Sequence, residues 1–214
     1  MIVNEKINSY IEKLVPERDT LLTRLEKEAE EENIPIIQLA SVQLIRTLLL
    51  SYRPRRILEI GTAIGYSTIW LAKAAPEASI VTMEINLERI QRAILNFEEA
   101  AISHRVELIE GDAGNGLPPH YHFDCLFLDA AKGQYKHYLD LYLPHLEPGG
   151  LVICDNILFK GLVVENQVEN KRLAPMIKKI QNFNQYLINH PLLDTSIIPI
   201  GDGLTFSVKK GECE

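Results

Sequence analysis

Cysteine is scarce in this sequence, with three residues among 214. Cys125 and Cys154 lie within apolar stretches and Cys213 lies in the C-terminal tail, a distribution typical of small core residues in a reducing compartment. We therefore expect neither a disulfide nor a zinc site. No apolar run approaches the roughly 20 residues of a membrane span, and the N-terminus lacks the charged-then-apolar order of a signal peptide. The sequence thus predicts a cytoplasmic protein with no membrane partner.

Positive charge is also in short supply, because 22 lysines and arginines face 29 acidic residues and leave a net charge of -7. This balance argues against a protein that coats nucleic acid generically, although it allows a local basic patch. The composition, 46% hydrophobic and 24% charged, is that of an ordinary globular protein. No linker, repeat or low-complexity segment interrupts the chain. We expect a single domain over 1–214, with an N-terminal helical segment at 1–52 and a core at 53–209.

The apolar pattern alternates between helical and strand periods along the core. Three helices, at about 4–14, 18–32 and 38–52, are predicted before the first strand. The core then reads as strands at 56–60, 79–84, 106–110, 123–129 and 151–155, helices at 66–75, 87–101, 134–146 and 173–189, and a hairpin of strands at 195–199 and 204–209. Such alternation predicts an α/β three-layer sandwich, in which a mostly parallel, seven-stranded sheet ends in an antiparallel hairpin. Ligands bind beyond the carboxyl ends of such strands.

The stretch from Ile57 to Ser67 reads as a buried strand, a glycine turn and the start of a helix. Gly61 and Gly65 let the backbone approach a ligand, and Glu59 places an acid near the end of the strand. A dinucleotide fold would show G-x-G-x-x-G, whereas this pattern, E-x-G-x-x-x-G, resembles motif I of class I S-adenosylmethionine methyltransferases, which share a Rossmann-like fold. A purely structural turn, or a turn that binds another nucleotide, is the alternative.

Acidic residues recur where the other predicted strands end. Glu84 lies 23 residues beyond Gly61, where an acid can accept hydrogen bonds from both ribose hydroxyls. Gly111-Asp112-Ala113 follows the next strand and is placed to meet an adenine. Asp129 and the pair Asp155-Asn156 follow two strands that are continuously apolar. A single such acid is more often a helix cap, but acids at four strand ends together favour a cofactor crevice.

Asp129, Asp155 and Asn156 form a second group. Their strands are expected to be central neighbours in the sheet, so their ends should meet. Two carboxylates and an amide carbonyl are hard oxygen ligands that suit Mg²⁺ or another hard divalent cation and leave positions for water or substrate. Helix capping and turn formation explain the same residue types without a metal.

Three further segments sharpen the resemblance. Residues 127–132 (Phe-Leu-Asp-Ala-Ala-Lys), 155–156 (Asp-Asn) and 199–204 (Pro-Ile-Gly-Asp-Gly-Leu) look like signature segments of the cation-dependent O-methyltransferases, the group of the caffeoyl-coenzyme A and catechol enzymes. The likeness spans about 35–209. Shorter stretches at 131–135, 157–163 and 171–172 resemble the bacterial branch that methylates 5-hydroxyuridine at the wobble position of tRNA to 5-methoxyuridine.

The resemblance implies roles for particular residues. Asp129, Asp155 and Asn156 match the metal ligands, and Lys132, together with Asp129, matches the catalytic group, with the lysine assisting deprotonation. Lys132 has an alternative interpretation as an exposed, solvated side chain. The residues that match the shell around S-adenosylmethionine are Ile37, Glu59, Gly61, Tyr66, Ser67, Glu84, Ile85, Gly111, Asp112, Ala113 and Asp129. Family likeness and the apolar N-terminal helices also suggest a homodimer.

The metal ligands define an acceptor geometry without naming the acceptor. A cation that chelates two vicinal oxygens orients the substrate and lowers the pKa of the attacking hydroxyl. A catechol and a 5-hydroxyuridine in a tRNA anticodon loop both offer such a pair. For tRNA, a flipped base would stack on Tyr135 or Phe159 while basic residues meet the flanking phosphates. We predict a Mg²⁺-dependent tRNA methyltransferase, with a small-molecule methyltransferase as the alternative and a non-catalytic binding module as a third hypothesis.

Overall fold

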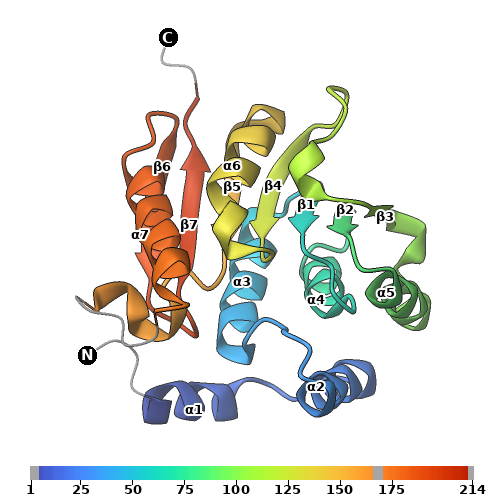
Figure 1. The fold of residues 1–214 in the computed structure, drawn as a ribbon. Coiled ribbons are helices and arrows are strands. Elements are labelled where there is room, and N and C mark those ends of the chain that lie inside the picture. Colours follow the sequence, from blue (N-terminus) through green and yellow to red (C-terminus); the bar gives the residue numbers. More distant parts are fainter. Residues whose placement is uncertain (1–4, 166–170, 212–214) are drawn as a thin grey trace.

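The computed structural model describes residues 5–165 and 171–211, and its centre is one mixed β-sheet (Figure 1). In this part of the chain seven strands pair in the order β3-β2-β1-β4-β5-β7-β6. Their bounds are Arg56–Ile60 (β1), Ser79–Glu84 (β2), Val106–Glu110 (β3), Phe123–Leu128 (β4), Leu146–Cys154 (β5), Leu193–Ile198 (β6) and Leu204–Lys209 (β7). β1 to β5 run parallel, whereas β7 pairs antiparallel with both β5 and β6. The predicted fold class is therefore confirmed.

Helices cover both faces of this sheet. They are Glu5–Leu14 (α1), Thr20–Glu32 (α2), Leu39–Tyr52 (α3), Tyr66–Ala74 (α4), Leu87–Glu99 (α5), Tyr135–Tyr142 (α6) and Ala174–Ile188 (α7). Successive strand residues point to opposite faces. Ile57 and Phe127 accordingly pack in one core with α3, α4 and α5, while Leu58 and Leu126 pack in the other with α6 and α7. The result is three layers with a core on each side of the sheet.

The N-terminal helices α1 and α2 lie on the side of the sheet toward which the parallel strands point (Figure 1). Polar contacts join α2 to the helices of the core: Arg92 on α5 pairs with Glu28 at 3.1 Å, and the Tyr66 hydroxyl on α4 donates to Glu26 at 2.8 Å. A single ion pair of this kind contributes little to stability, but together these contacts hold α2 against α4 and α5. The segment 35–37 that follows α2 is thereby held beside the carboxyl ends of the strands.

The largest difference from the predicted elements lies between 134 and 151. The helix predicted at 134–146 ends at Tyr142, because Leu143–His145 forms a 3₁₀ turn around Pro144, which has no backbone N–H to continue an α-helix. β5 then begins at Leu146, five residues earlier than predicted, and includes the two glycines 149 and 150. The carboxyl end of β5, which positions the site, is where the sequence places it.

The sparse cysteines behave as core residues where they are described. Cys125 and Cys154 are buried free thiols, and burial raises the pKa of the Cys154 thiol to about 12. Cys213 lies outside the described residues. Within those residues, no helix is both long enough and apolar enough to cross a bilayer.

Candidate active site

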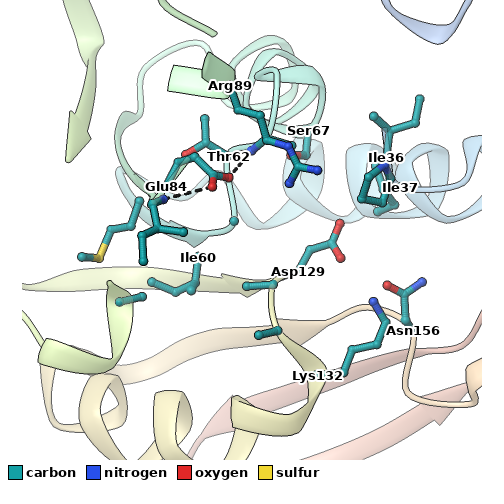
Figure 2. Close-up of a pocket in the computed structure, with 18 of the residues that line it drawn as sticks. Ile36, Ile37, Ile60, Thr62, Ser67, Glu84, Arg89, Asp129, Lys132 and Asn156 are labelled. Carbon is teal, nitrogen blue, oxygen red and sulfur yellow. Dashed lines mark hydrogen bonds between the residues drawn. The ribbon is translucent and has the colours of Figure 1, made fainter. Parts of the chain in front are cut away.

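A cavity of about 510 Å³ opens at the carboxyl ends of the parallel strands (Figure 2). It is walled by the β1–α4 turn, the residues after β2, β3 and β4, and the segment 35–37. Most of the residues that we expected in the site line it: Ile37, Gly61, Tyr66, Ser67, Glu84, Ile85, Gly111, Asp112, Ala113, Asp129, Lys132 and Asn156. Two expected residues, Glu59 and Asp155, are not part of the lining.

The β1–α4 turn passes unusually close to the end of β4. Gly61 has φ of 103°, and a Cβ atom at this position would lie 2.2 Å from the backbone oxygen of Asp129. A side chain therefore cannot be accommodated at 61. The Gly61 and Thr62 amides both donate to the Met83 carbonyl, at 3.1 and 3.2 Å, which ties the turn to β2. These contacts bring the ends of β1, β2 and β4 to one wall of the cavity.

Glu84 is held in place by backbone donors. The Ala63 amide donates to its Oε2 at 2.9 Å, and the Ile85 and Asn86 amides both donate to its Oε1 at 3.0 Å. Figure 2 shows the carboxylate beside Thr62, at the edge of the cavity. Glu84 is only 8% exposed, and both oxygens are engaged by the protein alone. The carboxylate is thus preorganised to accept further hydrogen bonds from a ligand.

Glu59 lies beneath the cavity instead of lining it. The side chain is fully buried and accepts hydrogen bonds from three hydroxyls, those of Ser67 at 2.6 Å, Thr68, and Thr82 at 2.6 Å. Burial raises the pKa of Glu59 to about 7, against the opposing effect of these three donors. The expected place of Glu59 in the cofactor shell stays a prediction, and its role would be indirect, since the acid reaches the cavity only through Ser67, whose hydroxyl it orients.

Asp129 and Asp155 follow neighbouring strands and lie side by side. The Asp155 amide donates to the Leu128 carbonyl at 3.0 Å, so the ladder between β4 and β5 continues to the residue before Asp129. Asp155 is 1% exposed, its Oδ1 accepts from the Asn156 amide at 2.7 Å, and its Oδ2 has no partner among the described residues. Burial first, and then the charge of Asp129, raise the pKa of Asp155 well above its ordinary value. An unpartnered buried carboxylate oxygen of this kind is a place where a cation fits.

Lys132 and Asn156 complete this edge. The ammonium group of Lys132 lowers the pKa values of both Asp129 and Asp155, in opposition to the larger effect of burial. Figure 2 shows Asp129, Lys132 and Asn156 converging on one part of the cavity, with the amide oxygen of Asn156 on the side of Lys132. Asp155 is covered by its neighbours and does not reach the lining. Among the described residues, no three His, Cys, Asp or Glu side chains gather into a metal site, so a cation here would depend on the amide of Asn156.

Several lining residues were not assigned from the sequence. Arg89, Tyr138 and Asp202 all face the cavity. Arg89 and Tyr138 sit within helices, where a single sequence carries no sign that a residue faces a ligand. Asp202 lies in the 199–204 segment that carries the family likeness, but no role was given to it. Tyr135, in contrast, is 1% exposed and donates its hydroxyl to the Asp155 carbonyl, so the expectation that a base stacks on Tyr135 is wrong.

Comparisons with known proteins all identify O-methyltransferases as similar to this chain. Residues 12–210 match a family model described as O-methyltransferase. A catechol O-methyltransferase from Niastella koreensis is 29% identical over 220 residues, which cover 96% of this chain and 97% of that protein. A Staphylococcus aureus structure, provisionally assigned as a caffeoyl-CoA O-methyltransferase, has a TM-score of 0.88 at 34% identity and covers 95% of this chain and 99% of its own. The O-methyltransferase TomG from Streptomyces achromogenes, solved with S-adenosylmethionine, has a TM-score of 0.82 at 27% identity and covers 96% of each chain.

Proposed function

The chain belongs to the O-methyltransferase family, and from that premise we propose that it moves the methyl group of S-adenosylmethionine to one of two adjacent oxygens of an acceptor, with a divalent cation. The single observation that carries the proposal is the pair of neighbouring acids, half-buried Asp129 and buried Asp155, at the edge of a cavity whose opposite wall presents Glu84 and Ser67. A cation site and a nucleoside cofactor site would then share one space. The complex of TomG with S-adenosylmethionine supports the choice of cofactor.

The donor set fits a hard divalent cation. Asp155 has an oxygen without a partner in the part of the chain that the structure describes, Asp129 lies beside it, and Asn156 presents an amide oxygen to the same part of the cavity. These three side chains would hold Mg²⁺ or a similar ion, since oxygen ligands suit such cations. A bound cation would fix two vicinal acceptor oxygens and lower the pKa of the hydroxyl that attacks the sulfonium methyl group.

The protein's own side chains perform the remaining tasks. Glu84 would accept hydrogen bonds from the ribose hydroxyls, and the Gly61 turn, which lines the cavity, would contact the methionine part of the cofactor. Ile37 and Tyr66, each 3% exposed or less, would exclude water from that part of the cavity. Lys132 lies beside both acids and, as a neutral amine, would receive the proton that leaves the acceptor hydroxyl.

Two acceptors fit the geometry. A small catechol-like molecule is favoured by relatives such as the catechol O-methyltransferase of Niastella koreensis. A 5-hydroxyuridine in tRNA is the second candidate, and the observation in its favour is that three basic side chains line the cavity: Arg89, Lys132 and Lys160. Phe159 also lines the cavity and is half-buried, so its ring is available to a planar acceptor of either kind.

The test is methyl transfer by the purified protein. Catechol, caffeoyl-coenzyme A and a tRNA anticodon stem-loop with 5-hydroxyuridine would each be incubated with labelled S-adenosylmethionine, and products would be identified by mass spectrometry. We expect transfer to one acceptor class, loss of transfer in EDTA and recovery with excess Mg²⁺. Methyl transfer that persists in EDTA would refute the requirement for a divalent cation. Turnover of the stem-loop alone would select the tRNA reading over the small-molecule reading.

A further inference from the structure

Asp202 connects the end of the sheet to the edge of the cavity that carries the acids. It lies in the short connection between β6 and β7, lines the cavity and is 8% exposed. Its Oδ1 accepts from the backbone amide of Lys160, and its Oδ2 lies 3.5 Å from the side-chain nitrogen of Asn156. Both oxygens therefore face donors of this chain, which distinguishes Asp202 from Asp155.

The contact with Asn156 decides which way its amide faces. An ionised carboxylate only accepts hydrogen bonds, and the amide nitrogen of asparagine only donates. The nitrogen of Asn156 must therefore turn toward Asp202, and Figure 2 shows the oxygen on the opposite side, toward Lys132. A flipped amide would set its oxygen against the Asp202 carboxylate and its nitrogen where a cation needs an oxygen.

The same carboxylate fastens the segment after Asn156. The Leu158 amide donates to the Asp202 carbonyl at 3.0 Å, alongside the contact between the Lys160 amide and the carboxylate. Phe159 and Lys160 have φ of 46° and 54°, a left-handed conformation that non-glycine residues rarely adopt and that must be held by surrounding contacts. Phe159 and Lys160 both line the cavity. Asp202 thus contacts both Asn156 and part of the cavity wall.

We propose that Asp202 is a positioning residue that orients the Asn156 amide oxygen toward the cation and fixes the Phe159–Lys160 wall of the acceptor site. The inference rests on the proposed cation-dependent function. Partners that orient a metal ligand typically contribute 10- to 100-fold to metal affinity, and we expect an effect in about that range. Asp202 does not touch the reacting atoms in this role, so cofactor affinity should stay unchanged.

The test is the affinity for Mn²⁺, measured by titration calorimetry or by the electron paramagnetic resonance of free Mn²⁺, with S-adenosylhomocysteine present. Asp202→Ala should weaken binding roughly 10- to 100-fold, while its affinity for S-adenosylhomocysteine in EDTA stays within about 2-fold of the wild type. Asp194→Ala is the matched control, because Asp194 is an exposed aspartate on β6 of the same hairpin. Unchanged Mn²⁺ affinity in Asp202→Ala would overturn the inference.

A double-mutant cycle distinguishes two ways in which Asp202 could affect Mn²⁺ binding: by orienting the Asn156 amide, or through its own negative charge alone. If Asp202 acts through Asn156, Asp202→Ala should weaken Mn²⁺ binding by less than about 3-fold in an Asn156→Ala background. An equally large loss in that background would show that Asp202 acts only as a nearby negative charge and would overturn the positioning role.

Two further results keep the test decisive. Should Asp202→Ala fail to fold, Asp202→Asn takes its place: its amide can accept at only one end, so one of the two donors faces another donor and Mn²⁺ binding should weaken. Wild-type affinity in Asp202→Asn would contradict the inference. Absence of Mn²⁺ binding by the wild type would instead refute the proposed function, and the inference with it.

Discussion

Glu84 and Asp155 both stand at the carboxyl end of a parallel strand, yet their surroundings differ. Glu84 receives three backbone N–H donors, which engage both of its oxygens. Among the described residues, the Asp155 carboxylate receives one such donor, at 2.7 Å, and its other oxygen has no partner and lies beside the like charge of Asp129. On the cofactor side of the cavity the protein itself satisfies the Glu84 carboxylate, whereas the negative charge of the acid pair is not balanced by enough donors.

The difference indicates which side depends on a bound ion. A buried carboxylate without donors favours its neutral form, and the pKa of Asp155 is raised accordingly. A divalent cation would reverse this preference, because it attracts both ionised carboxylates. We infer that the cofactor side is preorganised and that the acid pair gains its stability from the ion.

Asp155→Asn should have the largest effect, and it should act on activity and stability in opposite directions. The amide keeps the shape of the side chain but lowers the charge of the ligand set, so cation-dependent transfer should fall at least about 100-fold. In EDTA the same substitution removes a buried carboxylate next to Asp129. The free energy of unfolding, measured in urea at pH 8, should therefore rise by about 1–3 kcal/mol.

The pH dependence gives the control for this prediction. The pKa of Asp155 is raised in the folded state, so its contribution to stability is present at low pH and is lost as the pH rises through the folded pKa. Asparagine does not titrate, and the stabilisation by Asp155→Asn should grow with pH. Asp194→Asn, at an exposed position, should change neither activity nor the slope. A variant less stable than the wild type in EDTA at pH 8 would contradict the contrast drawn here.

Glu84→Ala should impair the other side of the cavity, where the cofactor is proposed to bind. Hydrogen bonds to a charged group contribute about 1.5–3 kcal/mol each, so the loss of even one ribose contact should weaken S-adenosylhomocysteine binding roughly 10- to 100-fold. Calorimetry would measure this effect, and Mn²⁺ affinity should remain that of the wild type. Glu88→Ala is the control, since Glu88 is an exposed acid on the first turn of α5. Equal losses of cofactor and Mn²⁺ binding would show that the two sides are not independent.

The order of helices and strands was predictable because it depends on local patterns. Apolar periods and breakers such as Pro76 determine where each element lies, and the strand bounds of β1, β2, β3 and β7 agree with the predicted ranges. The exception at 134–151 has two causes: the predicted helix passed over Pro144, a local signal that ends α6, and the start of β5 depends on pairing with β4. Local sequence carries little information about such contacts.

The sequence was enough to predict the strand-end residues of the site, but not which of them line the cavity and which lie beneath it. A strand pattern places Glu59 and Glu84 near the ends of their strands but does not say which of them a helix covers. α4 supplies Ser67 and Thr68 over Glu59, and this contact exists only in the folded chain. No role was assigned to Asp202 from the sequence for a related reason, since its partners Asn156 and Lys160 are more than 40 residues away in sequence.

Glu59→Gln should have the smallest effect on activity and tests whether this acid is structural. Burial raises the pKa of Glu59 from 4.5 to about 7, so its contribution to stability is present below the unfolded pKa and is lost as the pH rises through the folded value. Relative to Glu59→Gln, the free energy of unfolding of the wild type should fall by up to about 3 kcal/mol between pH 5 and pH 8. Urea titrations in EDTA without cofactor would measure it, with Glu88→Gln as a control that leaves the slope unchanged. Parallel pH profiles for the wild type and Glu59→Gln would mean that the three hydroxyl donors offset burial completely, and Glu59 would then resemble Glu84 in its full satisfaction by the protein.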